Sequence, residues 1–193
     1  AADGTTLARH ADQRRTFVAY QDIPPMVVQA FVSAEDKNYW THMGVDPLAI
    51  VRAGMHYISG DRVTGASTIT QQVAKNLLVG DEFSLGRKIR EGILAVNMTE
   101  DLSKERVLEI YLNEIYLGIG AYGVAAAADV FFSKTLEELT VEEAALLAAM
   151  PKAPSAFDPR KNPERVLIRR NYVLGRMVDD GVLDPAVAER AKA

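Results

Sequence analysis

The sequence of 193 residues contains no cysteine, which excludes disulfide bonds, thiolate catalysis and cysteine-ligated zinc sites. It also lacks an excess of positive charge, because 22 lysine and arginine residues stand against 26 aspartate and glutamate residues, for a net charge of -4. Proteins that bind nucleic acid generally present a basic surface. We therefore expect no nucleic-acid partner, while a local basic patch stays compatible with this balance.

Long hydrophobic runs are absent as well. A membrane-spanning helix needs roughly 18 or more consecutive apolar residues. The nearest approach, residues 115–132, is interrupted by Gly118, Gly120, Gly123 and Asp129, and we interpret it as buried packing. No segment of useful length alternates apolar and polar residues as a half-buried strand does. The expected fold is therefore all-α.

Proline and capping residues predict where helices begin. Pro24-Pro25 opens the first helix, because proline is tolerated in a first turn, and Asp46-Pro47 begins the second. Hydroxyl caps are expected for two later helices, at Ser103 and Thr140. The helices after the first are expected over residues 48–58, 67–78, 85–98, 103–112, 140–150, 164–179 and 185–192. Within the helix 85–98, the spacing of Ile89, Ile93 and Val96 predicts its core stripe.

Glu35 is the first candidate for chemistry. It follows Phe31 by four residues and Val28 by seven, so it projects from the edge of an apolar helix face. Partial burial of a carboxylate raises its pKa, which suits proton transfer. The alternative is an ordinary solvated charge at the end of a helix.

The residues after Glu35 allow a structural interpretation too. His42 alone is more often a hydrogen-bonded structural histidine than a ligand contact. Tyr39 and Trp40 are more often core residues than platforms on which sugars stack. These residues alone do not decide between the two interpretations.

Residues 65–76 form a polar segment that begins just after a glycine. In a helix, Gln71 and Lys75 are neighbours one turn apart, and Thr68 lies one turn before Gln72. Amides, a hydroxyl and an ammonium group on adjoining faces suit a hydroxyl-rich sugar and a phosphate. The alternative is a polar helix capped by one of its first hydroxyl residues.

Three cations crowd one helical turn at Arg87, Lys88 and Arg90, with Glu91 directly after them. A solvated charge run is the simpler interpretation. The functional one is a clamp for pyrophosphate with a second carboxylate beside it. Two carboxylates are the common apparatus of glycosidic chemistry, and the cations suit a phosphate leaving group. Together with Glu35, these segments indicate a sugar-phosphate transferase.

At this point the segments resemble a known family. The chain is similar, over about residues 20–185, to the glycosyltransferase family 51 domain of class A penicillin-binding proteins and monofunctional peptidoglycan transglycosylases. Five motifs carry the resemblance in order: Glu35-Asp36 with His42 and Gly44, residues 65–76, Arg87-Lys88-x-x-Glu91, KERVLEIYLN at 104–113, and residues 131–134. The run 144–154 also fits. Five ordered motifs are specific, whereas any one alone is weak.

The resemblance implies an all-α, lysozyme-like fold with a large head lobe and a smaller, membrane-facing jaw lobe. The jaw is expected roughly over residues 45–86, and the family domain over residues 23–193. Residues 1–22 are then an extended lead-in that follows a membrane anchor outside the sequence. The resemblance also implies a location on the outer, periplasmic side of the cytoplasmic membrane, with cell-wall synthesis proteins as partners.

The resemblance further implies the reaction. Such enzymes join lipid II to a growing glycan chain through β-1,4 links, with inversion and with undecaprenyl pyrophosphate as leaving group. Glu35 deprotonates the acceptor GlcNAc 4-hydroxyl, and Glu91 assists. The expected substrate-binding residues are Asp36, His42, Ser67, Thr68, Gln71, Gln72, Lys75, Asn76, Arg87, Lys88 and Arg90. Mg²⁺ or Mn²⁺ is expected with the pyrophosphate, and no residue is assigned as a metal ligand.

Some positions depart from the family pattern. Ala66 stands where glycine is usual, Asn97 and Thr99 where arginine and glutamate are common, and Phe131 and Ser133 where tyrosine and glycine are usual. None of these departures removes Glu35 or Lys75, so the expected base and its cation are retained.

Two other functions fit parts of the sequence. A lysozyme-like hydrolase or lytic transglycosylase would use Glu35 as an acid on finished peptidoglycan, without a need for Lys75 and the cations at 87–90. A non-catalytic wall-binding domain would fit the departures in the third and fifth motifs. Turnover of lipid II, compared with cleavage of purified sacculi, separates transferase from hydrolase.

Overall fold

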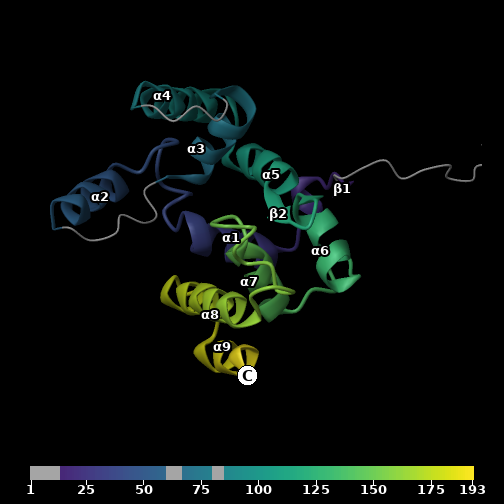
Figure 1. Cartoon of the computed structure of the whole chain (residues 1–193). Helices are drawn as coiled ribbons and strands as arrows, with labels where there is room; N and C mark the ends of the chain where they lie inside the picture. Colours follow the sequence, from purple (N-terminus) through teal and green to yellow (C-terminus); the bar gives the residue numbers. More distant parts are fainter. Residues whose placement is uncertain (1–13, 60–66, 80–84) are drawn as a thin grey trace, which may run out of the picture.

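The computed structural model describes residues 14–59, 67–79 and 85–193 (Figure 1). The helices in these ranges are α1 (Pro25–Glu35), α2 (Pro47–Ser59), α3 (Ile69–Ala74), α4 (Leu85–Asp101), α5 (Lys104–Glu114), α6 (Val124–Phe132), α7 (Val141–Ala149), α8 (Pro163–Asp179) and α9 (Pro185–Lys192). A short 3-10 helix, η1 (Tyr20–Asp22), precedes α1, and a π-helical turn, η2 (Lys75–Val79), continues α3. The all-α prediction is confirmed.

The core is built around α1, α7 and α8, which pack against one another at the centre of the molecule (Figure 1). Val27, Ala30 and Phe31 of α1 are fully buried there. The buried face of α7 is rich in alanine, and such small side chains let neighbouring helices approach closely. On one side, α5 and α6 extend this core, and α3 and α4 lie on the other (Figure 1).

A small sheet ties the lead-in to the body. Strand β1 (Arg14–Arg15) pairs in parallel with β3 (Ala121–Tyr122), which pairs antiparallel with β2 (Tyr116–Gly118). Beyond β1, the Asn113 side chain hydrogen-bonds both the N–H and the carbonyl of Val18, each at 2.8 Å. Residues 14–18 therefore form a strap fixed to the body of the molecule. Strands of two or three residues are too short to show a period, so the sequence did not predict this sheet.

The glycine-interrupted stretch 115–132 forms β2, β3 and α6, and its expected burial is largely confirmed. Leu117 and Val124, for example, are fully buried. Within the part of the chain that the structure describes, no helix has the length and apolar character that crossing a membrane requires.

The predicted core stripe of α4 is wrong. Ile89 and Ile93 are 57% and 56% exposed. The buried positions are instead Arg87, Glu91 and Ala95, which are four residues apart and share one face. This polar side of α4 packs toward α3, so the apolar side is left facing outward.

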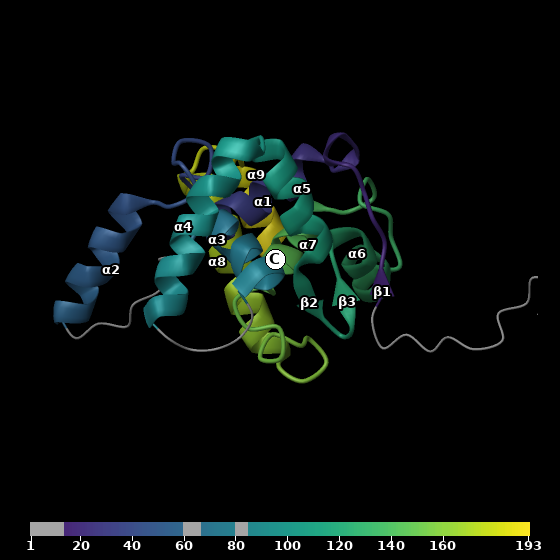
Figure 2. The same ribbon diagram turned by 90° about the horizontal axis from the view of Figure 1, so that it is seen from above.

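Helix α2 extends away from the body, as both views show (Figures 1 and 2). Leu48, Val51 and Met55 share one face of this helix, and all three are more than half exposed. With the outward isoleucines of α4, they give this end of the molecule an exposed apolar surface. We call these five residues the apolar end.

Candidate active site

Glu35 is the last residue of α1, and its side chain is only 13% exposed. Its Oε2 accepts a hydrogen bond of 3.0 Å from the Gln72 side chain, and Arg169 NH2 lies 3.9 Å from Oε1. Burial raises the pKa of Glu35, while the Gln72 hydrogen bond and the charges of Arg169 and Lys152 act in the opposite direction. The structure thus agrees with the position and the pKa direction expected from the helix period.

Asp36 fixes the start of α3 against the end of α1. Its Oδ2 accepts a hydrogen bond of 2.9 Å from the backbone N–H of Ile69, the first residue of α3. His42 Nε2 donates to the same carboxylate at 2.9 Å. Because Gln72 lies one turn after Ile69, this anchor brings the Gln72 amide to Glu35.

The N-terminus of α3 is closed by a capping box between Thr68 and Gln71. The Thr68 N–H donates to Gln71 Oε1 at 2.9 Å, and the Gln71 N–H donates to Thr68 Oγ1 at 3.1 Å. The Thr68 hydroxyl in turn donates to the carbonyl of Gly44. Four expected substrate contacts, Asp36, His42, Thr68 and Gln71, are therefore buried in internal bonds. Their geometry suits positioning of the site rather than contact with substrate.

The basic turn of α4 is organised around a buried carboxylate. The Glu91 side chain is 3% exposed; Lys88 donates a hydrogen bond to its Oε1, and Arg87 NH1 lies 4.0 Å from its Oε2. Lys88 also donates to the Ser67 hydroxyl at 2.8 Å. The Lys88 side chain is 43% exposed. Its ammonium group is therefore accessible to a ligand while it stays paired with the buried Glu91 carboxylate.

Lys75, Asn76 and Arg90 lie at the outer side of this region. Lys75 is half-buried at the start of η2, and Asn76 and Arg90 are exposed. Lys75 follows Gln72 by three residues, so the two share one side of the helix. Among the described residues, no ion pair or side-chain hydrogen bond of Lys75 is present. Its charge is therefore available to an anionic ligand.

Segment 67–76 connects the parts of the candidate site. One of its residues, Gln72, bonds to Glu35, and another, Ser67, bonds to Lys88. In Figure 1, α3 accordingly lies between α1 and α4. Glu35 and Lys88 are thus linked through this segment, although the cations that act on the pKa of Glu35 are Arg169 and Lys152. Residues 65 and 66 lie outside the described ranges.

Sequence reasoning missed Arg169, although a signal was available. Val166, Arg169 and Val173 have spacings of three and four residues, so they share one face of α8. Both valines are buried, and the Arg169 side chain is 12% exposed. An arginine on an otherwise apolar stripe indicates a buried charge that needs a partner. Lys152, by contrast, belongs to the run 144–154 that the resemblance includes.

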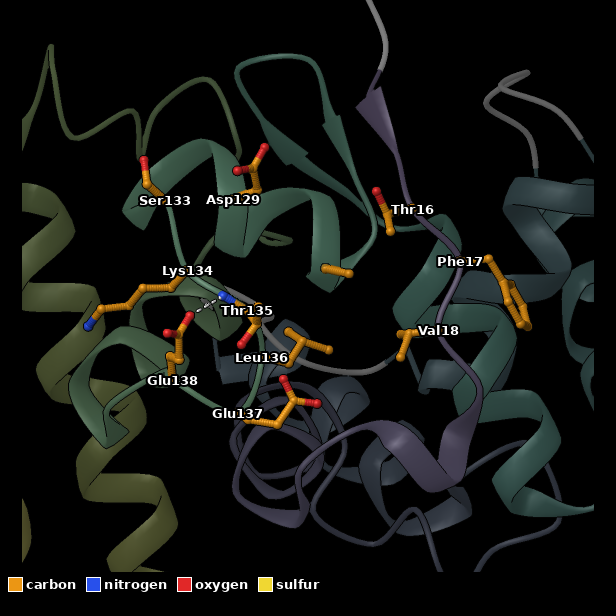
Figure 3. Close-up of a pocket in the computed structure, with 11 residues that line it drawn as sticks. Thr16, Phe17, Val18, Asp129, Ser133, Lys134, Thr135, Leu136, Glu137 and Glu138 are labelled. Carbon is orange, nitrogen blue, oxygen red and sulfur yellow. Dashed lines mark hydrogen bonds between the residues drawn. The ribbon is translucent and has the colours of Figure 1, made fainter.

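Two cavities in the described part of the chain are lined by none of the candidate residues. One, of about 440 Å³, lies between the lead-in, α6 and the loop 133–138 (Figure 3). There the Glu138 carboxylate already accepts a hydrogen bond of 2.8 Å from the Thr135 N–H. The other cavity, of about 460 Å³, is lined in part by α1 residues within the range 25–33 and by Trp40. Neither argues for a different catalytic centre.

The described residues contain no group of three or more histidine, aspartate or glutamate side chains that could hold a metal ion. The two carboxylates nearest the candidate site are already engaged: Asp36 by His42 and the α3 backbone, and Glu91 by Lys88. These residues do not fit a resident metal centre.

Comparison with known proteins agrees on one family. The family model described as transglycosylase matches residues 3–178. The chain is 52% identical over 180 residues to penicillin-binding protein 1A of Aquifex aeolicus, with 93% of this chain and 25% of that protein covered. It is 48% identical over 183 residues to penicillin-binding protein 1A of Escherichia coli, covering 94% of this chain and 22% of that protein.

A solved structure gives the same result. The crystal structure of penicillin-binding protein 1A from Haemophilus influenzae matches with a TM-score of 0.60 at 29% identity, over 99% of this chain and 19% of that one. The chain spans about a quarter of the length of the curated relatives it matches.

Proposed function

The chain belongs to the transglycosylase family, and from this premise we propose that it is a peptidoglycan glycosyltransferase domain whose general base is Glu35. The hydrogen bonding and the raised pKa of the Glu35 carboxylate support this role best. Its Oε2 is held by Gln72, whereas no described residue hydrogen-bonds to Oε1. Burial raises its pKa, and a base works best when its pKa approaches the working pH.

The proposed substrates are lipid II as acceptor and a glycan chain on undecaprenyl pyrophosphate as donor. Glu35 Oε1 takes the proton of the acceptor GlcNAc 4-hydroxyl while that oxygen attacks C1 of the donor MurNAc. The bond from C1 to the pyrophosphate oxygen breaks, and its electron pair leaves with the lipid pyrophosphate. Attack from the opposite face inverts C1 and gives the β-1,4 link.

We assign binding of the leaving group to the cations of η2 and α4. Lys75 and Lys88 are available for contact with pyrophosphate, and Arg90 is exposed on the same helix as Lys88. Glu91 acts here as a positioning residue, because it is buried and holds Lys88 in place. Any Mg²⁺ or Mn²⁺ would arrive bound to the pyrophosphate as part of the substrate, and no step requires it on the protein.

We further propose that the apolar end (Leu48, Val51, Met55, Ile89 and Ile93) lies against the membrane that carries the lipid substrates. An exposed apolar face on a helix is typical of contact with a bilayer surface. This arrangement would assign the jaw to roughly residues 45–86, with α4 at its border. The corresponding location is the periplasmic side of the cytoplasmic membrane.

The test of the function is incubation with labelled lipid II, followed by gel analysis of products with and without muramidase. We expect muramidase-sensitive polymer from the native sequence. Glu35→Gln should lower the rate at least about 100-fold, because it removes the base, while lipid II binding is kept. Glu164→Gln, an exposed glutamate on α8, is the matched control and should retain full activity.

Three outcomes would contradict the proposal. Unchanged polymer formation by Glu35→Gln would remove Glu35 from the role of base. Cleavage of purified sacculi without any turnover of lipid II would instead support a hydrolase or lytic transglycosylase. Binding to wall fragments without either reaction would support a non-catalytic wall-binding domain.

A further inference from the structure

Arg169 reaches the proposed base from a distant part of the chain. It lies on α8, and its NH2 is 3.9 Å from Glu35 Oε1, the carboxylate oxygen that is not hydrogen-bonded to Gln72. The two side chains are 12% and 13% exposed, so water screens their interaction only weakly.

The guanidinium group is held by packing rather than by a hydrogen bond to Glu35. Its carbon lies 4.6 Å from the centre of the Tyr172 ring, an aromatic platform one turn along α8. The separation of 3.9 Å from Glu35 is too long for a hydrogen bond. Arg169 Nε is buried without a partner among the described residues. Arg169 therefore contributes a fixed positive charge and leaves Oε1 open to a substrate hydroxyl.

We propose that Arg169 is a positioning residue for the transfer reaction: its buried charge keeps Glu35 ionised, and therefore able to accept a proton, without occupying the oxygen that receives it. This inference rests on the proposed role of Glu35 as base. It explains why a positive charge interrupts the apolar stripe of α8.

Other groups that act on Glu35 are weaker candidates for this task. Burial is the main influence and raises the pKa of Glu35, and Asp36 raises it further. Against these act the Gln72 hydrogen bond, Arg169 and Lys152. Lys152 is exposed, so water and salt screen its charge.

One more titratable group belongs to this environment. Tyr111 of α5 is fully buried, and burial raises its pKa well above the ordinary value, with Glu35 adding to the effect. Tyr111 is therefore neutral at any working pH and supplies no positive charge. Arg169 is the buried cation among the groups that act on Glu35.

The test compares the rate of polymerisation across pH for Arg169→Met and Arg169→Lys. The neutral variant, Arg169→Met, should shift the acid limb of the pH–rate profile, where the rate rises with pH, to higher pH. On that limb its rate should fall roughly tenfold, and on the plateau less than about threefold, as expected for loss of an opposite charge at this distance. Arg169→Lys should recover most of the difference. Arg165→Met, an exposed arginine one turn earlier on α8, should leave the profile unchanged.

A purely structural role would give a different pattern. A misfolded variant loses activity at every pH alike and has a lower thermal midpoint, whereas the proposed role moves the limb. If Arg169→Met does not fold, Arg169→Gln provides a second neutral side chain. An unmoved acid limb in the neutral variants, or an equal movement in Arg165→Met, would overturn the inference.

A direct titration separates this inference from the proposed function. The carboxyl ¹³C resonance of Glu35 can be assigned by its loss in Glu35→Gln and followed with pH. Its midpoint should lie higher in Arg169→Met than in the native sequence, and equal midpoints would overturn the inference. If Glu35→Gln still polymerises lipid II, the base assignment fails instead, whatever this titration gives.

Discussion

At the residue scale, the burial of Glu35 has a consequence for stability that depends on pH. Because burial raises its pKa, the folded chain holds this proton more tightly than the unfolded chain does. The stabilisation from this group is complete below the unfolded value of about 4.5. It is lost as pH rises through the higher folded value. Above that window, the ionised carboxylate makes the fold less stable than a neutral side chain would.

Glu35→Gln should therefore stabilise the protein while it removes activity. We expect a higher thermal midpoint than that of the native sequence near neutral pH, by about 2–4 °C for each kcal/mol gained. The difference should shrink as pH falls toward 4. Thermal unfolding from pH 4 to pH 8 measures it, with Glu164→Gln as the exposed control. A lower midpoint at neutral pH would contradict the expected cost of burying this charge.

The two charges of the proposed site differ in how far the sequence predicted them. The position of Glu35 follows from its spacing to Phe31 and Val28, because a helix period assigns residues to a face. Arg169 lies in a stripe with Val166 and Val173 in the same way. The period alone does not say which element packs against that stripe. The contact with Glu35, 134 positions away in sequence, arises only from the packing of α8 on α1.

At the scale of elements, the predicted helix starts are confirmed where local chemistry determines them. Asp46 Oδ1 accepts hydrogen bonds from the N–H groups of Leu48 and Ala49. Ser103 accepts one from Arg106, and the N–H of Thr140 donates to the glutamate three residues later. Such bonds involve only the first turn, so the sequence around a cap is sufficient to predict it.

Orientation was harder to predict than helix position. The spacing of Ile89 and Ile93 correctly places them on one face of α4, yet that face is exposed. Periodicity says which residues share a side, and a polar site can occupy the buried side in place of a core. Here Arg87 and Glu91 take the inward positions.

The end of α6 gives a prediction at this scale. Ser133, the C-cap residue of α6, has a φ of 55° in the left-handed region. Side chains in this region are strained by roughly 1 kcal/mol relative to glycine. Ser133→Gly should therefore raise stability by about 0.5–1 kcal/mol. Urea unfolding would measure the gain.

A serine in ordinary backbone geometry is the matched control for this change. Ser155 is exposed, and its φ is not positive. Ser155→Gly should give no gain or a small loss, because glycine only adds freedom to the unfolded chain there. Equal gains in both variants would argue against relief of strain at residue 133.

At the scale of the whole molecule, the proposed membrane contact is asymmetric. The apolar end lies on α2 and α4, at one side of the body (Figures 1 and 2). Substitution there should weaken binding to a bilayer without disturbing the fold, because these side chains make little contact with the core. We expect this weaker bilayer binding from the loss of apolar surface alone, without any change in charge.

Leu48→Ser combined with Met55→Ser should lower binding to phosphatidylglycerol-containing vesicles at least about tenfold, since each apolar side chain that enters a bilayer contributes on the order of 1 kcal/mol. Co-sedimentation measures the binding. Ile168→Ser is the matched control, because Ile168 is 72% exposed on α8. Its vesicle binding and the thermal midpoints of all variants should stay unchanged. Equal loss in the control would show that the contact is not specific to α2.

The strap that fixes the lead-in has a mechanical consequence. It enters the body at β1, across the molecule from α2 in both views (Figures 1 and 2), and the bonds from Asn113 make that entry rigid. A rigid body that is held at two separate points can rotate only about the line that joins those points. If the strap were held while α2 rests on lipid, as proposed, the domain could rotate about that axis but could not turn α2 away from the membrane.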